Sequence, residues 1–283
     1  MSKRYYRDRS WRCVSECKLD RLRALLRPMD RVAVAYSGGV DSALLLRISK
    51  EVLGDNVIAI MNVSPLTAPG EEDEAVLAAR SMGVEALIVR ADPLADAAFR
   101  HNRTDRCYRC KRMVFEAIAA AARERGIENV IDGTHVDDMS EDRPGRRALA
   151  ELGIRSPLQE AGLGKEEVRA FARQLSVPSA DRPSGPCLAT RIPFDQEITP
   201  DALQMVGEAE KVLKELGVRS VRVRHHGTMA RIEVPPEDFA AIVDMRATVV
   251  ERLKRIGFVY VAVDLQGFRS GSMSEALGRK AEH

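Results

Sequence analysis

Short apolar runs alternate with amphipathic stretches through the first half of the chain. The apolar runs predict buried strands at residues 31–36, 56–63, 84–91 and 128–134. Helical spacing between them predicts helices at 43–53, 71–83, 92–100 and 112–125. The strands read as continuous apolar runs, which is typical of strands covered on both faces. The alternation therefore predicts an α/β fold, a parallel sheet with helices on both faces.

The pattern changes after residue 134. Residues 135–147 are polar and predict a loop, and 177–187 is rich in proline, serine and glycine. Gly227 separates two alternating runs and predicts a β-hairpin. A helix is expected at 164–175, before this region. The order of the elements that follow predicts a small α+β domain with an antiparallel sheet. Its expected elements are a helix at 200–216, strands at 218–225 and 228–234, a helix at 236–256 and a strand at 257–264.

These patterns divide the chain into four parts. Leucines at helical spacing predict a peripheral helical segment at residues 1–30. The main α/β domain is expected at 31–195 and the small α+β domain at 196–268. Residues 269–283 are expected to be a flexible tail.

Composition narrows the classes of function. The 283 residues include 44 Lys and Arg and 42 Asp and Glu, a net charge of +2 that indicates no particular partner. No run approaches the roughly 18 apolar residues that a membrane helix needs, and the basic N-terminus lacks the apolar segment of a secretory signal. We therefore expect a cytoplasmic protein without a membrane partner. The odd number of cysteines, 5, argues against a disulfide framework.

The segment SGGVDS, residues 37–42, lies between the first predicted strand and the following helix. Its two glycines let the backbone turn sharply and direct N–H groups at an anion, and the helix N-terminus adds partial positive charge. Ser37 and Ser42 can donate hydrogen bonds to phosphate oxygens. Asp41 would repel a bare phosphate, so we expect it to hold Mg²⁺ on that phosphate. The alternative is an ordinary strand-to-helix turn.

Three of the cysteines are candidates for chemistry. Cys107 and Cys110 are expected just before a helix, where two thiolates could bind one metal. A zinc knuckle, a redox pair, an iron–sulfur ligand and a chance spacing all fit this pair. Cys187 lies in the irregular segment SGPCLATRIPF, four residues before Arg191, whose guanidinium would favour the reactive thiolate. A loop cysteine without a function is the alternative for Cys187.

The string SGGVDS, between an apolar strand and an apolar helix, resembles the PP-loop of the N-type ATP pyrophosphatases. That resemblance implies that ATP is cleaved between its α and β phosphates, that AMP is transferred to the substrate and that pyrophosphate leaves. It also implies that the end of the second strand receives the adenine. The implied ATP-binding residues are Ser37, Gly38, Gly39, Val40, Asp41, Ser42, Met61 and Gly133. Asp137 and Asp138 are either close to the nucleotide or part of a solvated loop.

Four segments in order, SGGVDS, RCYRCK, GTHVDDMSEDRPGRRA and GPCLATRIPF, resemble the LarE family over about residues 15–268. The resemblance implies an enzyme of nickel-pincer nucleotide cofactor biosynthesis. It would adenylate a carboxylate of a pyridinium mononucleotide, derived from nicotinic acid, and convert it to a thiocarboxylate.

The source of sulfur divides this family. In one version a single cysteine gives up its sulfur and becomes dehydroalanine. In the other, three cysteines hold a [4Fe–4S] cluster with one iron free of protein thiolate. Cys107, Cys110 and Cys187 match the second version, although Cys187 could be a ligand, the sulfur donor or both.

An anionic mononucleotide requires arginines. Arg222 and Arg224 lie two apart on one predicted strand and so share a face. With Arg191 they could clamp the substrate's phosphate and its free carboxylate, while a solvated strand face is the alternative. Cys187, Asp41 and Arg191 are the expected catalytic residues. Glu208, Glu210 and Glu233 could belong to a secondary metal or interface site, but nothing in their local sequence requires one.

Other functions fit parts of the pattern. A PP-loop tRNA thiolase would need a basic surface, and the arginines near the N-terminus only hint at one; salt-sensitive tRNA binding would favour it. A non-catalytic ATP sensor would bind ATP without forming AMP and pyrophosphate. An amidotransferase-type ligase would need ammonia from elsewhere, since the chain has no glutaminase domain. We expect a homo-oligomer that acts on a small molecule and has no nucleic-acid partner.

Overall fold

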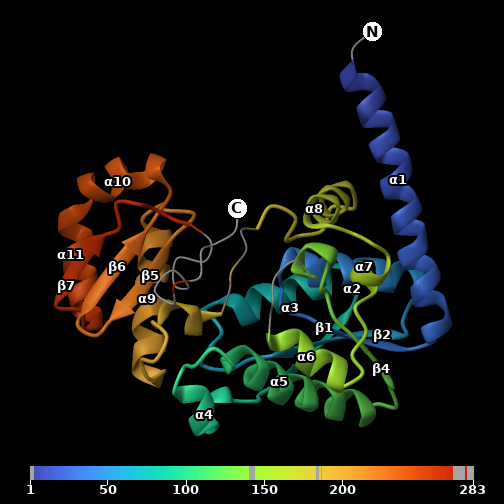
Figure 1. The fold of residues 1–283 in the computed structure, drawn as a ribbon, viewed down its shortest axis with the longest axis horizontal. Coiled ribbons are helices and arrows are strands. Elements are labelled where there is room, and N and C mark those ends of the chain that lie inside the picture. Colours follow the sequence, from blue (N-terminus) through green and yellow to red (C-terminus); the bar gives the residue numbers. More distant parts are fainter. Residues whose placement is uncertain (1–2, 140–143, 183–184, 186, 270–277, 279–283) are drawn as a thin grey trace. The chain divides into compact units, whose positions relative to one another are not determined.

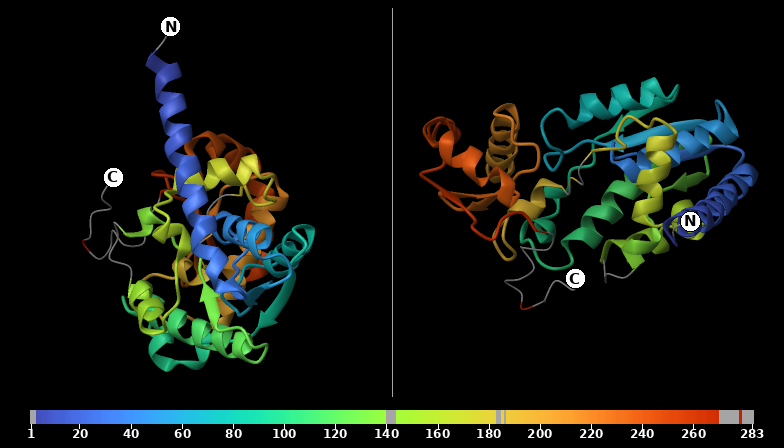
Figure 2. Two further views of the ribbon diagram at one scale, coloured as in Figure 1. Left: turned by 90° about the vertical axis from the view of Figure 1, so that its right-hand side faces the viewer. Right: turned by 90° about the horizontal axis from the view of Figure 1, so that it is seen from above.

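The computed structural model describes residues 3–139, 144–182, 185, 187–269 and 278, with side chains from residue 15 onward. They form two compact units (Figures 1 and 2). The first unit comprises residues 1–63, 71–91 and 107–185, and the second comprises 64–70, 92–106 and 186–283. The chain therefore leaves the first unit twice and returns to it. The sequence predicts four consecutive parts, whereas these two units alternate along the chain. The four-part division therefore stays a prediction.

The first unit contains a four-stranded sheet in the order β3-β2-β1-β4. All three pairs of neighbouring strands are parallel, and Val32 pairs with both Val57 and Asn129. The predicted α/β fold with a parallel sheet is confirmed. The strands are β1 (Val32–Ala35), β2 (Val57–Asn62), β3 (Glu85–Val89) and β4 (Asn129–Ile131).

Helices pack on both faces of this sheet (Figure 2). Alternate residues of a strand point to opposite faces, so Val32 and Val34 pack in one core with Leu44, whereas Ala33 packs in another with Ile118. The first core contains α1 (Lys3–Leu26), α2 (Val40–Leu53), α3 (Glu71–Ser81), α7 (Pro157–Glu160) and α8 (Lys165–Gln174). The second contains α5 (Arg106–Arg123). The remaining elements are η1 (Arg27–Met29), η3 (Val136–Met139) and α6 (Pro144–Glu151).

The C-terminal half of α1 is fixed to the core. Leu22 and Leu26 are fully buried, and Glu167 of α8 accepts hydrogen bonds from Ser15 Oγ at 2.9 Å and from Lys18 Nζ at 2.8 Å. Burial alone raises the pKa of Glu167, but the hydrogen bonds from Lys18, the Gly164 backbone and Ser15 outweigh it and leave the pKa below its ordinary value. The predicted helix is present, and its second half belongs to the core.

The second unit has a three-stranded sheet in the order β5-β6-β7. β5 and β6 form the predicted hairpin around Gly227, which has a φ of +63°. β5 and β6 are antiparallel, as predicted, but β6 and β7 are parallel, so the sheet is mixed and the prediction is wrong for β7. Two helices connect these strands and return the chain to the end where β6 began, which parallel pairing requires. The elements are η2 (Pro93–Ala95), α4 (Ala97–Arg100), η4 (Leu188–Arg191), α9 (Pro200–Glu215), β5 (Arg222–His226), β6 (Met229–Glu233), η5 (Pro236–Asp238), α10 (Phe239–Asp244), α11 (Arg246–Ile256) and β7 (Tyr260–Val263).

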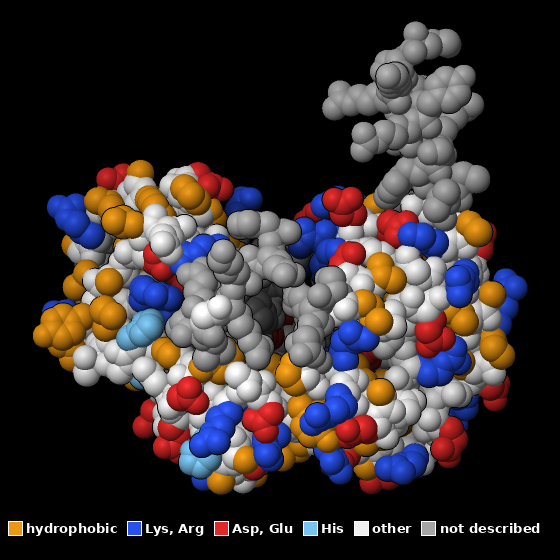
Figure 3. All heavy atoms as spheres, in the orientation of Figure 1, with side chains coloured by type: hydrophobic (Ala, Val, Ile, Leu, Met, Phe, Trp, Pro, Cys, Tyr) orange, Lys and Arg blue, Asp and Glu red, His pale blue; other side chains and the backbone are white. Residues whose placement is uncertain are grey.

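Apolar side chains are exposed at the edge strand β7 and beside its two ends. Figure 3 shows hydrophobic side chains gathered over β7. Val259, Tyr260 and Leu265 are 50%, 65% and 85% exposed. An exposed apolar edge strand is a surface on which another chain can pair.

Three local predictions need correction or fall outside the described chain. The helix expected at 112–125 begins at Arg106, so Cys107 and Cys110 lie in its first turn. α6, at residues 144–151, begins within the predicted loop at 135–147, while 140–143 lie outside the described residues. The predicted tail lies outside them too, apart from Arg269 and Gly278. Within the described part of the chain, no helix combines the length and apolar character needed to span a membrane.

Candidate functional site

The phosphate loop joins β1 to α2 and is held by its own serines. Ser42 Oγ accepts a hydrogen bond from the Ser37 N–H at 3.2 Å and donates one to the Gly39 carbonyl at 3.1 Å. Gly38 has a φ of +74°, and a Cβ there would lie 3.0 Å from the Ala75 Cβ, so only glycine fits. The loop is thus shaped to hold an anion at the N-terminus of α2.

The end of β4 presses against the first turn of α2. A Cβ on Gly133 would lie 2.8 Å from the Ser42 backbone nitrogen and 3.0 Å from the Asp41 carbonyl carbon. Both neighbours are backbone atoms, which cannot rotate away. Gly133 and the loop line a pocket of about 270 Å³. The structure therefore brings together Gly133 and the loop residues that the sequence assigned to ATP.

We expect Gly133→Ala to weaken ATP binding by roughly 10- to 100-fold, because overpacking costs about 1–3 kcal/mol and here displaces the phosphate loop. Titration with ATP measures the change. Gly185→Ala is the matched control, since its Cβ would approach only Glu71 Oε1, at 3.6 Å. Equal ATP affinity in the two variants would show that the contact does not shape the site.

Asp41 faces the pocket and carries a counterion from another helix. Its carboxylate lies 2.6 and 2.7 Å from Lys165 Nζ at the start of α8, and its side chain is 27% exposed. His135 Nε2 lies 3.9 Å away. Asp138 lines the same pocket. A partly exposed carboxylate beside a phosphate loop suits Mg²⁺, which takes one or two carboxylates and completes its shell with phosphates and water.

Sequence reasoning placed the strand end at 132–134 near the nucleotide but missed two lysines. Lys111, which follows Cys110, lines the pocket, and Lys165 pairs with Asp41. Lys111 Nζ lies 3.9 Å from Asp132 Oδ2. Asp132 is buried and accepts hydrogen bonds from Thr134 Oγ1 at 2.6 Å and Ser156 Oγ at 2.5 Å. The position of Lys111 directly after the Cys107–Cys110 pair was the available signal for it.

Met61 does not present its side chain to a ligand. It is 4% exposed and packs in the core with α2. The neighbouring Asn62 side chain bonds the Ala91 backbone, donating to its carbonyl at 3.1 Å and accepting from its N–H at 2.8 Å. An adenine at this strand end would therefore meet backbone groups, and the role of Met61 stays a prediction.

The cysteines occupy two settings. Cys107 is exposed and Cys110 half-buried, three residues apart on the first turn of α5, so they share a face beside the positive end of the helix. Cys187 is exposed, precedes η4 and belongs to the second unit. Among the described residues, no group of three His, Cys, Asp or Glu side chains forms a metal site. The donor chemistry of Cys107 and Cys110 nevertheless fits a thiolate-bound metal group.

Two of the predicted arginines are buried in ion pairs. Arg191 donates to Glu210 through Nε at 2.7 Å and Nη2 at 2.9 Å, and both side chains are at most 6% exposed. Arg224 donates to Glu233 at 2.7 Å and to the Thr190 carbonyl at 2.7 Å. Glu210 and Glu233 are therefore counterions within the second unit. Arg191 and Arg224 are therefore already paired with protein carboxylates before any substrate binds. Their role in substrate binding stays a prediction.

Arg222 differs from them. It is half-buried and lies over the Phe268 ring, 4.3 Å from its centroid. No carboxylate of the described residues lies within ion-pair distance of it. Burial lowers the pKa of Arg222 to about 10, and the charges of Arg224 and Arg191 act in the same direction. Arg222 is thus a positive charge without an ion-paired carboxylate among the described residues, and an anion would stabilise it.

Pyridinium-3,5-bisthiocarboxylic acid mononucleotide synthase of Lactiplantibacillus plantarum is 37% identical to the chain over 255 residues, which are 90% of this chain and 92% of the relative. The chain belongs to the LarE family. An uncharacterized protein of Synechocystis is 40% identical over 264 residues, 93% of this chain and 98% of that protein. No protein-family model matches the chain.

More distant similarity places the LarE family among PP-loop enzymes. One of the subunits of the glutamine-hydrolyzing GMP synthase of Archaeoglobus fulgidus is 27% identical over 199 residues, 65% of this chain and 64% of that protein. The family resemblance, the fold and the use of ATP by a sulfur transferase that the sequence predicts are thereby confirmed. The roles of individual residues stay predictions.

Proposed function

We propose that this LarE-family chain adenylates a carboxylate of a pyridinium mononucleotide derived from nicotinic acid and converts it to a thiocarboxylate, as a step of nickel-pincer nucleotide cofactor biosynthesis. The observation that carries the proposal is the phosphate loop, preformed by Ser37 and Ser42 and closed from behind by Gly133. The relative's name supports the substrate class, because the two chains match over 92% of the relative's length.

In the first step a substrate carboxylate oxygen attacks the α-phosphorus of ATP. The bond to pyrophosphate breaks, and the acyl-adenylate forms. The N–H groups at the start of α2 stabilise the charge on the phosphates. Asp41 would hold Mg²⁺, which supplies charge neutralisation on the phosphate oxygens. Lys165, which pairs with Asp41, and Lys111, which lines the pocket, would add positive charge near the phosphate groups.

In the second step a sulfur nucleophile forms a bond to the acyl carbon, and AMP leaves with the electron pair of the broken C–O bond. Cys107, Cys110 and Cys187 would hold the [4Fe–4S] cluster, which would supply an iron with an open coordination position. If Cys187 is instead the donor, its Sγ joins the acyl carbon. Its Cβ–Sγ bond then breaks with loss of the Cα proton, leaving dehydroalanine.

Arg222, with Arg191 and Arg224 beside it, would bind an anionic group of the substrate in the second unit. The positive charge of Arg222, which has no ion-paired carboxylate among the described residues, supports that role. The apolar edge over β7 supports the proposed homo-oligomer. A cytoplasmic location and the absence of a nucleic-acid partner complete the proposal.

Incubation with ATP and the pyridinium dicarboxylate mononucleotide tests the function. We expect AMP and pyrophosphate in equal amounts, and a substrate product heavier by the replacement of oxygen with sulfur. Asp41→Asn should lower AMP formation by at least about 100-fold, because a lost charge-stabilising group typically costs that much. Release of ADP, or AMP formation that requires tRNA and falls steeply with salt, would contradict the proposal.

A further inference from the structure

The stretch of chain that carries Cys187 is exposed at the thiol and buried directly after it. Cys187 is exposed, whereas Leu188, Ala189 and Ile192 are at most 3% exposed. The Leu188 N–H also donates to the Leu66 carbonyl at 3.1 Å. The thiol therefore stands at the surface on backbone that is packed into the second unit.

Two buried polar residues from an earlier part of the second unit bind this backbone. Asn102 is fully buried and has a φ of +57°, a left-handed conformation that asparagine tolerates better than most residues. Its Nδ2 donates to the Ile192 carbonyl at 3.2 Å and to the Pro193 carbonyl at 2.7 Å. Arg106 Nη1 donates to Asn102 Oδ1 and, at 3.2 Å, to the Ala189 carbonyl. Together they hold the backbone that follows Cys187.

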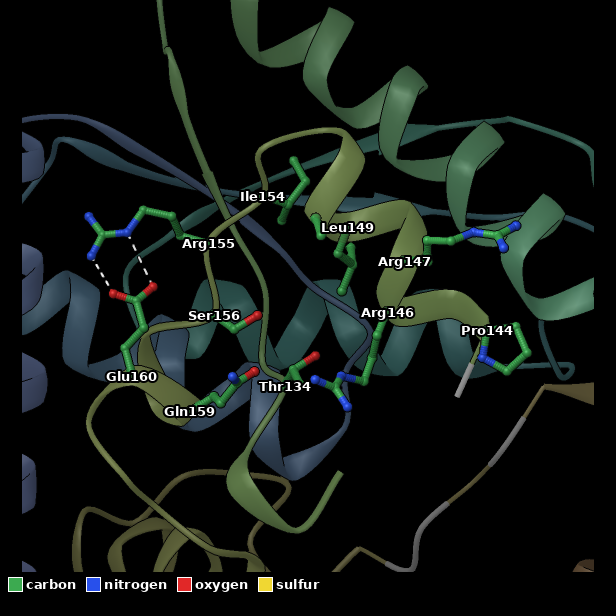
Figure 4. Close-up of a pocket in the computed structure, with 11 residues that line it drawn as sticks. Thr134, Pro144, Arg146, Arg147, Leu149, Ile154, Arg155, Ser156, Gln159 and Glu160 are labelled. Atoms are coloured by element: carbon green, nitrogen blue, oxygen red, sulfur yellow. Dashed lines mark hydrogen bonds and ion pairs between the residues drawn. The ribbon is translucent and has the colours of Figure 1, made fainter. Parts of the chain in front are cut away.

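Arg106 is an unusual anchor because its charge has no carboxylate partner. Arg155, by contrast, forms a two-pronged contact with Glu160 (Figure 4). Arg106 is 5% exposed, and no carboxylate of the described residues lies within ion-pair distance of it. Its Cζ lies 4.5 Å from the centroid of the Phe194 ring. A buried cation that is held only by carbonyl oxygens and a ring favours an anionic group nearby.

The place of Arg106 in the sequence connects two of the candidate thiols. Arg106 is the first residue of α5 and directly precedes Cys107. The carbonyl that it binds belongs to Ala189, two positions after Cys187. One side chain thus joins the backbone next to Cys107 to the backbone next to Cys187, although 83 positions separate the two bonded residues.

We propose that Arg106 is a positioning residue for the iron–sulfur group, and that it holds Cys187 ready to bind iron together with Cys107 and Cys110. The inference rests on the proposed function. Arg106 acts through Asn102 and the Ala189 carbonyl, without binding iron itself. Groups that orient metal ligands govern metal affinity. A cluster on three thiolates is also anionic, so the buried charge of Arg106 favours it electrostatically.

Hydrogen exchange of the metal-free protein, followed by mass spectrometry, tests the anchor without a cluster. In Arg106→Gln we expect amide exchange within residues 187–196 to become roughly 10- to 100-fold faster, because a buried hydrogen bond from a charged group is lost. Exchange in β1 to β4 should stay unchanged, which shows that the variant is folded. The hydrogen-bonded amides to follow are those of Leu188, Thr190, Ile192 and Asp195.

Competition with an iron chelator, after purification without oxygen, tests the role toward the metal. Arg106→Gln should hold its iron roughly 10- to 100-fold more weakly than the wild type. Arg106→Lys should recover part of this affinity, because it keeps the charge without the planar fork. Arg100→Gln is the matched control, since Arg100 lies in the same unit and also donates to a backbone carbonyl, that of Leu94, at 2.7 Å. It should match the wild type in both measurements.

Unchanged exchange in Arg106→Gln would overturn the anchor, and faster exchange with wild-type iron affinity would overturn its role toward the metal. A wild type without iron overturns the inference as well, yet adenylation stands if that protein forms AMP. Arg106-dependent iron in a protein that makes no AMP from ATP and the mononucleotide contradicts the proposed function alone. If Arg106→Gln does not fold, Phe194→Leu should cause the same changes at smaller size, and wild-type behaviour would refute the inference.

Discussion

Protein purified without oxygen is expected to contain about four iron and four inorganic sulfide per chain, and Cys107→Ala is expected to lose them. Cys107 and Cys110 stand on one face of the first turn of α5, where the helix N-terminus favours thiolates. Removing one of three ligands leaves two, too few to retain a cluster. Iron and sulfide analysis with a visible absorption spectrum measures the loss.

Cys17→Ala is the matched control, because Cys17 is also exposed but lies on α1, outside the proposed ligand set. It should retain the iron. Cys187→Ala should lose both the iron and the thiocarboxylate product while still forming AMP from ATP and substrate, since adenylation does not use the thiol.

One alternative outcome would reassign the cysteines. If the wild-type protein contains no iron, and turnover leaves Cys187 lighter by the mass of hydrogen sulfide, Cys187 is the sacrificial donor. Cys107 and Cys110 would then have no role in sulfur transfer.

The second large effect is on stability. Glu233→Gln is expected to lower the free energy of unfolding by about 3–5 kcal/mol, because it leaves a buried guanidinium without its counterion. Glu233 is fully buried and accepts hydrogen bonds from Arg224 at 2.7 Å and from Arg231 at 2.9 Å. Arg224 is 1% exposed, so water cannot replace the lost charge. Urea unfolding followed by circular dichroism measures the change.

Glu251→Gln provides the comparison. Glu251 pairs with Arg255 at 2.5 Å on the surface of α11, and its side chain is 59% exposed. An exposed pair of this kind contributes less than about 1 kcal/mol. If both variants unfold at the same urea concentration, the buried pair does not stabilise the second unit as argued.

Much of the fold follows from local pattern. The strands around Val32, Val57 and Val130 read as apolar runs because both faces of a parallel sheet are covered, and Figure 1 shows those helices. The phosphate loop was equally readable, since Gly38 needs its left-handed backbone whatever surrounds it. These features depend on neighbours in sequence.

Errors arose where local signals are weak or contacts are distant. α5 starts at Arg106, whose side chain is held by a residue far along the chain: Arg106 donates to the Ala189 carbonyl at 3.2 Å. Gly227 predicts the hairpin of β5 and β6, but no local feature of the sequence predicts which strand pairs with β7. Strand pairing across two intervening helices is decided by packing rather than by a turn.

By itself, the sequence determined the α/β class, the anion-binding turn, the candidate thiols and the family resemblance, because each depends on residue type and spacing. Only the tertiary structure decided which charges are available to a ligand. Arg224 and Arg191 receive counterions from β6 and α9, while Arg222 has no carboxylate of the described residues within ion-pair distance. A buried charge must find an opposite charge, and that partner can come from any segment that the fold brings near.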